Sequence, residues 1–148
     1  MTVDEKVVCI ETDSFLFEAP DGFQVTSLDE EAELLGANQE FLVVSSYSID
    51  DTSSDEVQKD FMNNIADAMK EAADEPDLIV NGKLTKNTTE NGMAVYSVLA
   101  ETSDKSHFFD QYAVINKTTA VVTTIEGDIE NRTCSAKVEE AIHAVEFK

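Results

Sequence analysis

A chain of 148 residues with 42% apolar residues is long enough to bury a core and too apolar to be intrinsically disordered. Acidic residues number 31 against ten basic ones, and the resulting net charge of −21 disfavours nucleic acid and anionic membranes as partners. No apolar run approaches the roughly 20 residues that span a bilayer, so no membrane insertion is expected.

The first quarter of the chain alternates short extended segments with turns. Lys6–Glu11 and Phe15–Phe17 are predicted strands. The second strand stops at Ala19-Pro20-Asp21-Gly22, where proline fixes one φ angle and glycine is free to take a positive one. The segment Asp29–Leu35 is crowded with acids and is expected to form a short helical turn capped at Ser27.

The middle of the chain predicts a strand followed by the one long helix. Phe41–Ile49 is apolar on both alternating faces at its start, which suits a central strand covered on both sides. In the expected helix Ser53–Ala73, Ser53 and Glu56 form a capping box, and Pro76 prevents continuation. An apolar residue recurs at every fourth position, which predicts one face packed on a sheet. These residues are Val57, Phe61, Ile65 and Met69.

The second half predicts a strand meander and a closing helix. Short polar loops separate the strands, and a helix from about Thr133 to Val145 follows. The predicted strands are Leu78–Leu84, Met93–Ala100, His107–Ile115 and Thr119–Glu126. The order predicts a single α+β domain over residues 1–148. It is a mostly antiparallel sheet with one long central helix and a C-terminal helix packed against it.

The segment Phe15-Leu16-Phe17-Glu18-Ala19-Pro20-Asp21-Gly22-Phe23 resembles the opening of the PsbP-like and DcrB-like proteins. The order of elements continues the resemblance through Tyr112–Ile115, Val121–Ile125 and a final helix to Phe147. It covers most of the chain and carries no catalytic motif. The resemblance implies an antiparallel sheet with helices packed on it and a non-enzymatic role. Such relatives serve as extrinsic photosystem subunits, bacterial lipoproteins, import cofactors that bind a small GTPase, or adaptors for secreted toxins, and no residue-level function transfers.

Residue types that carry chemistry are sparse. His107 and His143 are the two histidines, and surface positions explain them better than a catalytic or metal role. The acids lack the spacing of a calcium loop, and there is no phosphate-binding or nucleophile motif. We therefore expect no enzyme activity, cofactor or metal. Cys9 and Cys134 leave a disulfide and two reduced thiols equally open.

The function expected from these observations is a protein-binding or adaptor module with an acidic surface that meets a basic partner. Solubility or a salty habitat would also explain the acidity. One alternative is an immunity protein that neutralises a basic toxin or nuclease. Another is a small-ligand carrier with Tyr96, Tyr112 or His107 at the mouth of a pocket. The candidate partner-binding acids are Asp50, Asp51, Asp55, Glu71, Asp74, Glu75 and Asp77.

The start of the chain lacks the basic-then-apolar plan of a signal peptide, which predicts a cytoplasmic location. The trimmed body of an exported or lipid-anchored protein is the alternative. The sequence does not indicate the oligomeric state.

Overall fold

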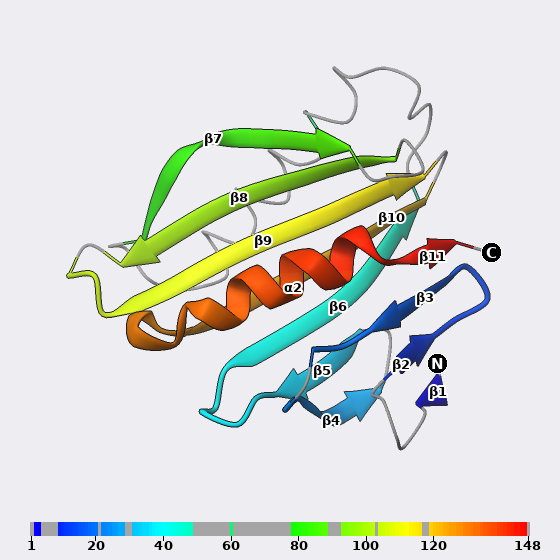
Figure 1. Ribbon diagram of the computed structural model, residues 1–148, viewed down its shortest axis with the longest axis horizontal. Helices are drawn as coiled ribbons and strands as arrows, with labels where there is room; N and C mark the ends of the chain where they lie inside the picture. The colour runs from blue at the N-terminus through cyan, green and yellow to red at the C-terminus, as the bar shows by residue number, and fades with distance from the viewer. Residues whose placement is uncertain are drawn as a thin grey trace.

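The computed structural model describes residues 2–3, 9–20, 22–28, 31–48, 60, 78–88, 93–102, 104–116 and 119–147 (Figure 1). Within these ranges the strands form one four-stranded and one seven-stranded sheet. The smaller sheet has the order β1-β2-β3-β11 and joins both ends of the chain. Its strands are β1 (Thr2–Val3), β2 (Cys9–Glu11), β3 (Phe15–Glu18) and β11 (Glu146–Phe147).

The larger sheet has the order β4-β5-β6-β10-β9-β8-β7, and every neighbouring pair is antiparallel. Its last four strands in the chain form the meander that the sequence predicts. Antiparallel pairing fits the short polar loops, because such loops can join adjacent strands directly. The strands are β4 (Gln24–Leu28), β5 (Ala32–Leu35), β6 (Phe41–Ser48), β7 (Leu78–Thr88), β8 (Ala94–Thr102), β9 (His107–Asn116) and β10 (Thr119–Asp128).

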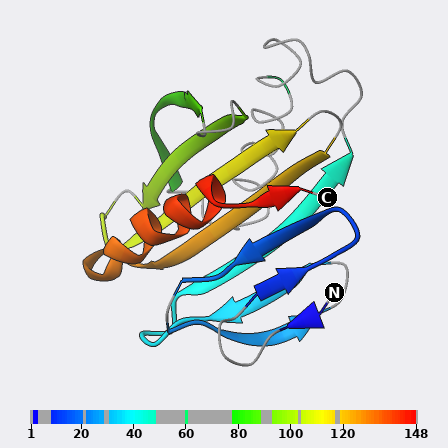
Figure 2. The ribbon, with the colours of Figure 1, turned by 45° about the vertical axis from the view of Figure 1, so that its right-hand side comes forward.

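One face of the large sheet is covered by α2 (Thr133–His143) and by the small sheet (Figures 1 and 2). A short 3-10 helix, η1 (Ile129–Asn131), leads from β10 into α2. The apolar side of α2 packs on β9, β10 and β3. Side chains from both sheets and α2 form a single core, which includes Phe15, Phe17, Leu42, Tyr112, Val121, Ile125, Val138 and Ile142. Burial of each large side chain of this kind contributes roughly 1.5–3 kcal/mol.

The opposite face of the large sheet, here called the far face, carries the alternate residues of the same strands. Tyr112 and Val114 belong to the core under α2, so Ala113 and Ile115, which alternate with them along the strand, face the other way. The far face holds a second buried cluster of Tyr96, Ala113, Ile115, Ala120 and Val122. β9 thus presents apolar side chains to both faces of the sheet.

The helical turn predicted over Asp29–Leu35 is wrong. Ala32–Leu35 is β5, which pairs with β4 on one side and β6 on the other. Burial alternates along it, with Ala32 and Leu34 in the core and Leu35 exposed. Strand pairing on both sides supplies backbone hydrogen bonds that a single helical turn would leave unmade, so tertiary pairing decides the conformation.

Two boundaries differ from the sequence prediction near the C-terminus. The last helix ends at His143 rather than Val145, and the chain then joins β3 as the short strand β11. Gly127 and Asp128, predicted as loop, extend β10. Pairing with a partner strand that is distant in the sequence again decides each difference.

The long helix predicted over Ser53–Ala73 is not among the described elements, because all of that range except Asp60 lies outside the described residues. Asp60 itself is helical. No helix in the described ranges combines the length and apolar content needed to cross a membrane.

Candidate functional site

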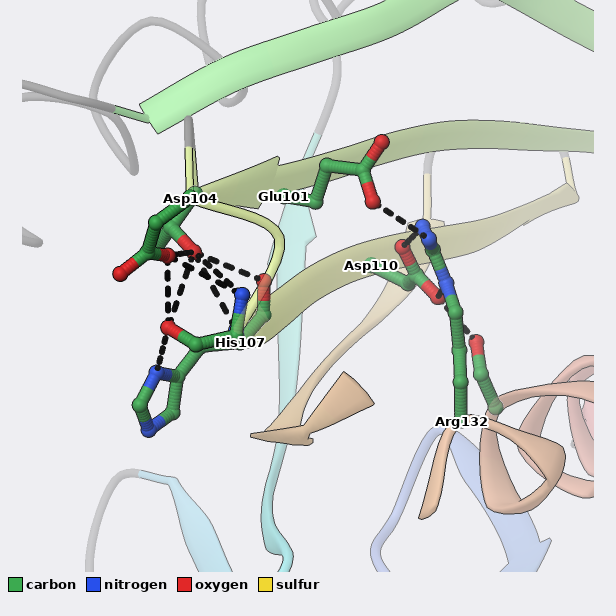
Figure 3. A network of polar contacts seen from close by, with 8 residues as sticks. Glu101, Asp104, His107, Asp110 and Arg132 are labelled. Atoms are coloured by element: carbon green, nitrogen blue, oxygen red, sulfur yellow. Dashed lines mark hydrogen bonds and ion pairs between the residues drawn. The ribbon is translucent and has the colours of Figure 1, made fainter. Parts of the chain in front are cut away.

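Charged and hydroxyl side chains gather beneath the start of α2, on the core side of β8 and β9 (Figure 3). Arg132, the only arginine of the chain, immediately precedes α2 and extends its side chain to β9. Its Nη2 donates to Asp110 Oδ1 at 2.7 Å and its Nε to Oδ2 at 3.2 Å. Its Nη1 lies 3.5 Å from Glu101 Oε2 on β8. The Asp110 side chain is 1% exposed, so this two-pronged ion pair is largely shielded from water.

Two hydroxyl groups extend the network beyond the Asp110 carboxylate, one bound to it directly and one bound to the first hydroxyl. Ser135 Oγ, in the first turn of α2, donates to Asp110 Oδ2 at 2.6 Å. The Tyr112 hydroxyl lies 2.7 Å from the same Ser135 oxygen. Because the one hydroxyl proton of Ser135 is directed to Asp110, Tyr112 must donate to Ser135. The result is a donor chain from Tyr112 through Ser135 to the carboxylate.

The electrostatics agree with this assignment. Hydrogen bonding to Asp110 raises the pKa of Arg132, so the guanidinium stays charged. Burial raises the pKa of Tyr112 to about 12, although the hydrogen bond with Ser135 opposes the shift, so the phenol keeps its proton. The guanidinium carbon also lies 5.7 Å from the centroid of the Phe108 ring. The network therefore acts as a polar anchor that fixes the start of α2 on the sheet. The Ser135 hydroxyl is fully used within it, because it donates to Asp110 and accepts from Tyr112.

A second polar cluster lies at the loop between β8 and β9 (Figure 3). Asp104 Oδ1 accepts from Thr102 Oγ1 and from Ser106 Oγ, each at 2.6 Å, and from the Ser106 amide at 3.0 Å. These bonds, led by the one from Ser106, lower the pKa of Asp104 to about 2. Lys105 takes a positive φ of 59° within the same turn. Asp104 therefore organises the loop as a negatively charged acceptor.

His107 links this loop to the end of β10. Its Nδ1 lies 2.9 Å from Ser106 Oγ, and its Nε2 lies 3.2 Å from Asp128 Oδ1. Ser106 donates its hydroxyl proton to Asp104, so its oxygen accepts from His107 Nδ1. The contacts of His107 with Ser106 and Asp128 are exposed to solvent, and they connect the β8–β9 loop to the end of β10.

Glu40, next to the start of β6, is a buried carboxyl group that the sequence analysis did not single out. It is 5% exposed, and its Oε1 has no hydrogen-bond partner in the described part of the chain. Gly36 and Gly127 lie against it, and a Cβ on Gly127 would come within 3.3 Å of Glu40 Cγ. Burial, and then the charges of Glu40 and Asp110, raise the pKa of the Cys134 thiol to about 11.

All seven acids proposed for partner binding lie outside the described residues: Asp50, Asp51, Asp55, Glu71, Asp74, Glu75 and Asp77. The three side chains proposed to line a pocket are not brought together. Tyr96 lies on the far face, Tyr112 lies in the core under α2, and His107 is exposed at the loop.

The remaining candidates for chemistry are also placed. Cys9 and Cys134, both half-buried within the described residues, are not joined in a disulfide. His143 lies in the last turn of α2, as predicted, where a cation would complement the helix dipole. Within the described ranges, no group of three or more His, Cys, Asp or Glu side chains is arranged to hold a metal ion.

The sequence did contain a signal for the Arg132 network. Asp110 occupies a core-facing position of β9 between Phe108 and Tyr112. A carboxylate at such a position needs a cation or several donors, and a lone arginine elsewhere in the chain is the natural partner. The pairing itself depends on where α2 begins relative to β9, which local pattern does not specify.

Comparison with known proteins identifies the fold. No family model matches the sequence, and no curated protein matches it. The structure is similar to the solution structure of cyanobacterial PsbP (CyanoP) from Synechocystis sp. PCC 6803, with a TM-score of 0.63 and 12% sequence identity. The match covers 99% of this chain and 91% of that chain. The protein therefore has a PsbP-like α+β fold.

Proposed function

We propose that this protein is a non-catalytic binding module that meets a basic protein partner through an acidic surface. The observation that carries the proposal is the net charge of −21, which would accelerate and orient encounter with a basic surface. The Arg132 network supports the non-catalytic part, because its buried hydroxyls are engaged in fixing α2.

The proposed surface lies at the ends of the expected helix Ser53–Ala73. Asp50, Asp51 and Asp55 would precede the helix, where acids also stabilise the helix dipole. The acids at the other end oppose that dipole, so a structural role explains them less well and we prefer them as the binding surface. They are Glu71, Asp74, Glu75 and Asp77.

The test is an affinity pull-down from the native organism at low and at moderate salt, read by mass spectrometry. We expect one dominant basic partner that is lost as the salt concentration rises. Reversal of Glu71, Asp74 and Glu75 to lysine should abolish the interaction. The matched control reverses the exposed Glu18, Glu140 and Glu146, which changes the net charge equally. Equal loss in both variants would contradict a localised surface, and no enriched protein at either salt would contradict the proposal.

Partner identity separates the proposed adaptor role from its rivals. A basic toxin or nuclease as the partner would assign the protein as an immunity protein. The ligand-carrier alternative has less support, because Tyr96 and Tyr112 face opposite sides of the sheet. The proposal assumes a cytoplasmic protein, and the exported or lipid-anchored form is the alternative.

A further inference from the structure

One end of the far face combines partly exposed apolar side chains with an acid that has no partner among the described residues. The cross-strand register places Leu35 opposite Phe41, Phe41 opposite Glu126, and Glu126 opposite Phe109. These four residues of β5, β6, β10 and β9 therefore form one continuous row, here called the Glu126 row. Leu35 is 39% exposed, and the other three are partly exposed. The Glu126 row therefore lies at the molecular surface, and none of its four residues belongs to either buried cluster.

Glu126 lies between two phenylalanines in this row. Burial raises the pKa of its carboxyl group, and the nearby His107 offsets the shift only in part. Within the described part of the chain, the Glu126 side chain has no hydrogen bond or ion pair. A carboxylate that is partly desolvated and unpaired loses hydration without gaining a partner. A cation supplied from outside would restore the missing interaction.

Further acids flank the row on both sides. Asp128 follows two residues after Glu126 on the same face of β10, and Glu33 precedes Leu35 by two residues on β5. Asp128 already contacts His107, whereas Glu33 is half-buried beside the row. The electrostatic potential over the Glu126 row is therefore negative, which favours a positively charged binding partner.

The contacts on the core face of β9 indicate which cation would pair with Glu126. On its core face, Arg132 lies over the Phe108 ring and pairs with the carboxylate of Asp110. On its far face, Phe109 lies opposite Glu126 in the cross-strand register. Guanidinium groups stack on aromatic rings and pair with carboxylates in a fork, whereas ammonium groups are more strongly hydrated. The far face offers the same partners without the arginine.

We propose that the Glu126 row is a docking site for a segment of a partner protein that inserts an arginine between Phe41 and Phe109 and covers Leu35 with an apolar side chain. The inference rests on the proposed function and adds a second contact surface with a stated partner chemistry. Acids elsewhere would attract any basic protein, but this row would select arginine next to an apolar residue.

The probe is a fluorescein-labelled peptide in which arginines alternate with leucines, measured by fluorescence anisotropy at about 0.15 M salt. The control peptide has serines in place of the leucines and the same charge. We expect Glu126→Gln to weaken binding of the leucine peptide about tenfold, as loss of a partly desolvated charge pair would. Glu140→Gln removes the same charge from the exposed surface of α2 and should leave affinity unchanged.

Equal binding of the two peptides, or equal effects of the two substitutions, would overturn the inference. Amide chemical shifts should change at Leu35, Phe41 and Phe109 when the leucine peptide is added, and shifts confined to other segments would also overturn it. Glu126→Gln should keep or raise the melting temperature, because it removes an unpaired charge, so misfolding would be recognised.

The native partner separates this inference from the proposed function. A partner lost on reversal of Glu71, Asp74 and Glu75 but retained by Glu126→Gln would overturn the docking row and leave the proposed function standing. If no basic partner is captured, the proposed function fails, and the peptide measurements still decide whether the row binds arginine.

Discussion

Asp110 shows how a single buried charge is accommodated in this fold. Its carboxylate receives two bonds from Arg132 and one from Ser135, and Tyr112 in turn donates to Ser135. The cost of burying the charge is offset because Arg132 and Ser135 together donate three hydrogen bonds to the carboxylate. Glu40 is the opposite case, since it is buried and one of its carboxylate oxygens has no hydrogen-bond partner within the described part of the chain. The two buried carboxylates therefore lead to different predictions for the free energy of unfolding.

Arg132→Ala should lower the free energy of unfolding by about 3 kcal/mol, because it leaves the Asp110 charge buried without its cation. Urea denaturation measures the change. The double variant Arg132→Met with Asp110→Leu should regain most of the loss, since no charge is then stranded. A loss below about 1 kcal/mol in the single variant would indicate an ordinary surface ion pair instead.

Glu40→Met should raise the free energy of unfolding by about 1 kcal/mol, because an apolar side chain of similar shape replaces a buried group with an unsatisfied oxygen. Thermal and urea unfolding would report the gain. Glu140→Met on the exposed side of α2 serves as the control and should change little. Destabilisation by Glu40→Met would mean that the carboxylate makes a needed interaction.

Asp104 predicts a pH dependence in the acid range. Its pKa is about 2 in the folded protein and 3.8 ordinarily, so the unfolded chain binds this proton more tightly. The contribution of Asp104 to stability is therefore complete above its ordinary pKa and is lost as the pH falls toward 2. Asp104→Asn should make unfolding less steeply dependent on pH there. Identical acid profiles for the variant and the parent, measured by circular dichroism, would contradict this.

Strand β5 is the element where local pattern and tertiary pairing disagree. Its acids suggested a helical turn, yet β4 and β6 flank it with backbone hydrogen bonds. Similarly, β11 forms only because β3 offers a free edge to the end of the chain. Pairing partners distant in the sequence supply the stabilisation in both cases.

The strand assignment of β5 predicts unequal effects at adjacent positions. Leu34→Ala should destabilise the protein by about 2–5 kcal/mol, because Leu34 is fully buried in the core. Leu35→Ala should cost less than about 1 kcal/mol, since Leu35 points to the far face and is partly exposed. Similar losses at both positions, by urea denaturation, would contradict the alternation.

The charge of the whole molecule sets its response to salt. With a net charge of −21, mutual repulsion opposes the compact state, and added ions screen that repulsion. The melting temperature should rise by several degrees between about 0.02 M and about 0.3 M NaCl. Choline chloride should act equally, because screening does not depend on the cation. A larger effect of one cation would indicate specific binding instead.

The sequence by itself determined the alternating strands, the meander, the closing helix and the acidic character, because each depends on residues close together in the chain. It also indicated the PsbP-like fold through the order of these elements. The tertiary structure alone decided the separate small sheet, the strand at Ala32–Leu35 and the Arg132–Asp110 pair. Each of these requires residues from distant segments to meet, and only the register and packing of the sheets bring them together.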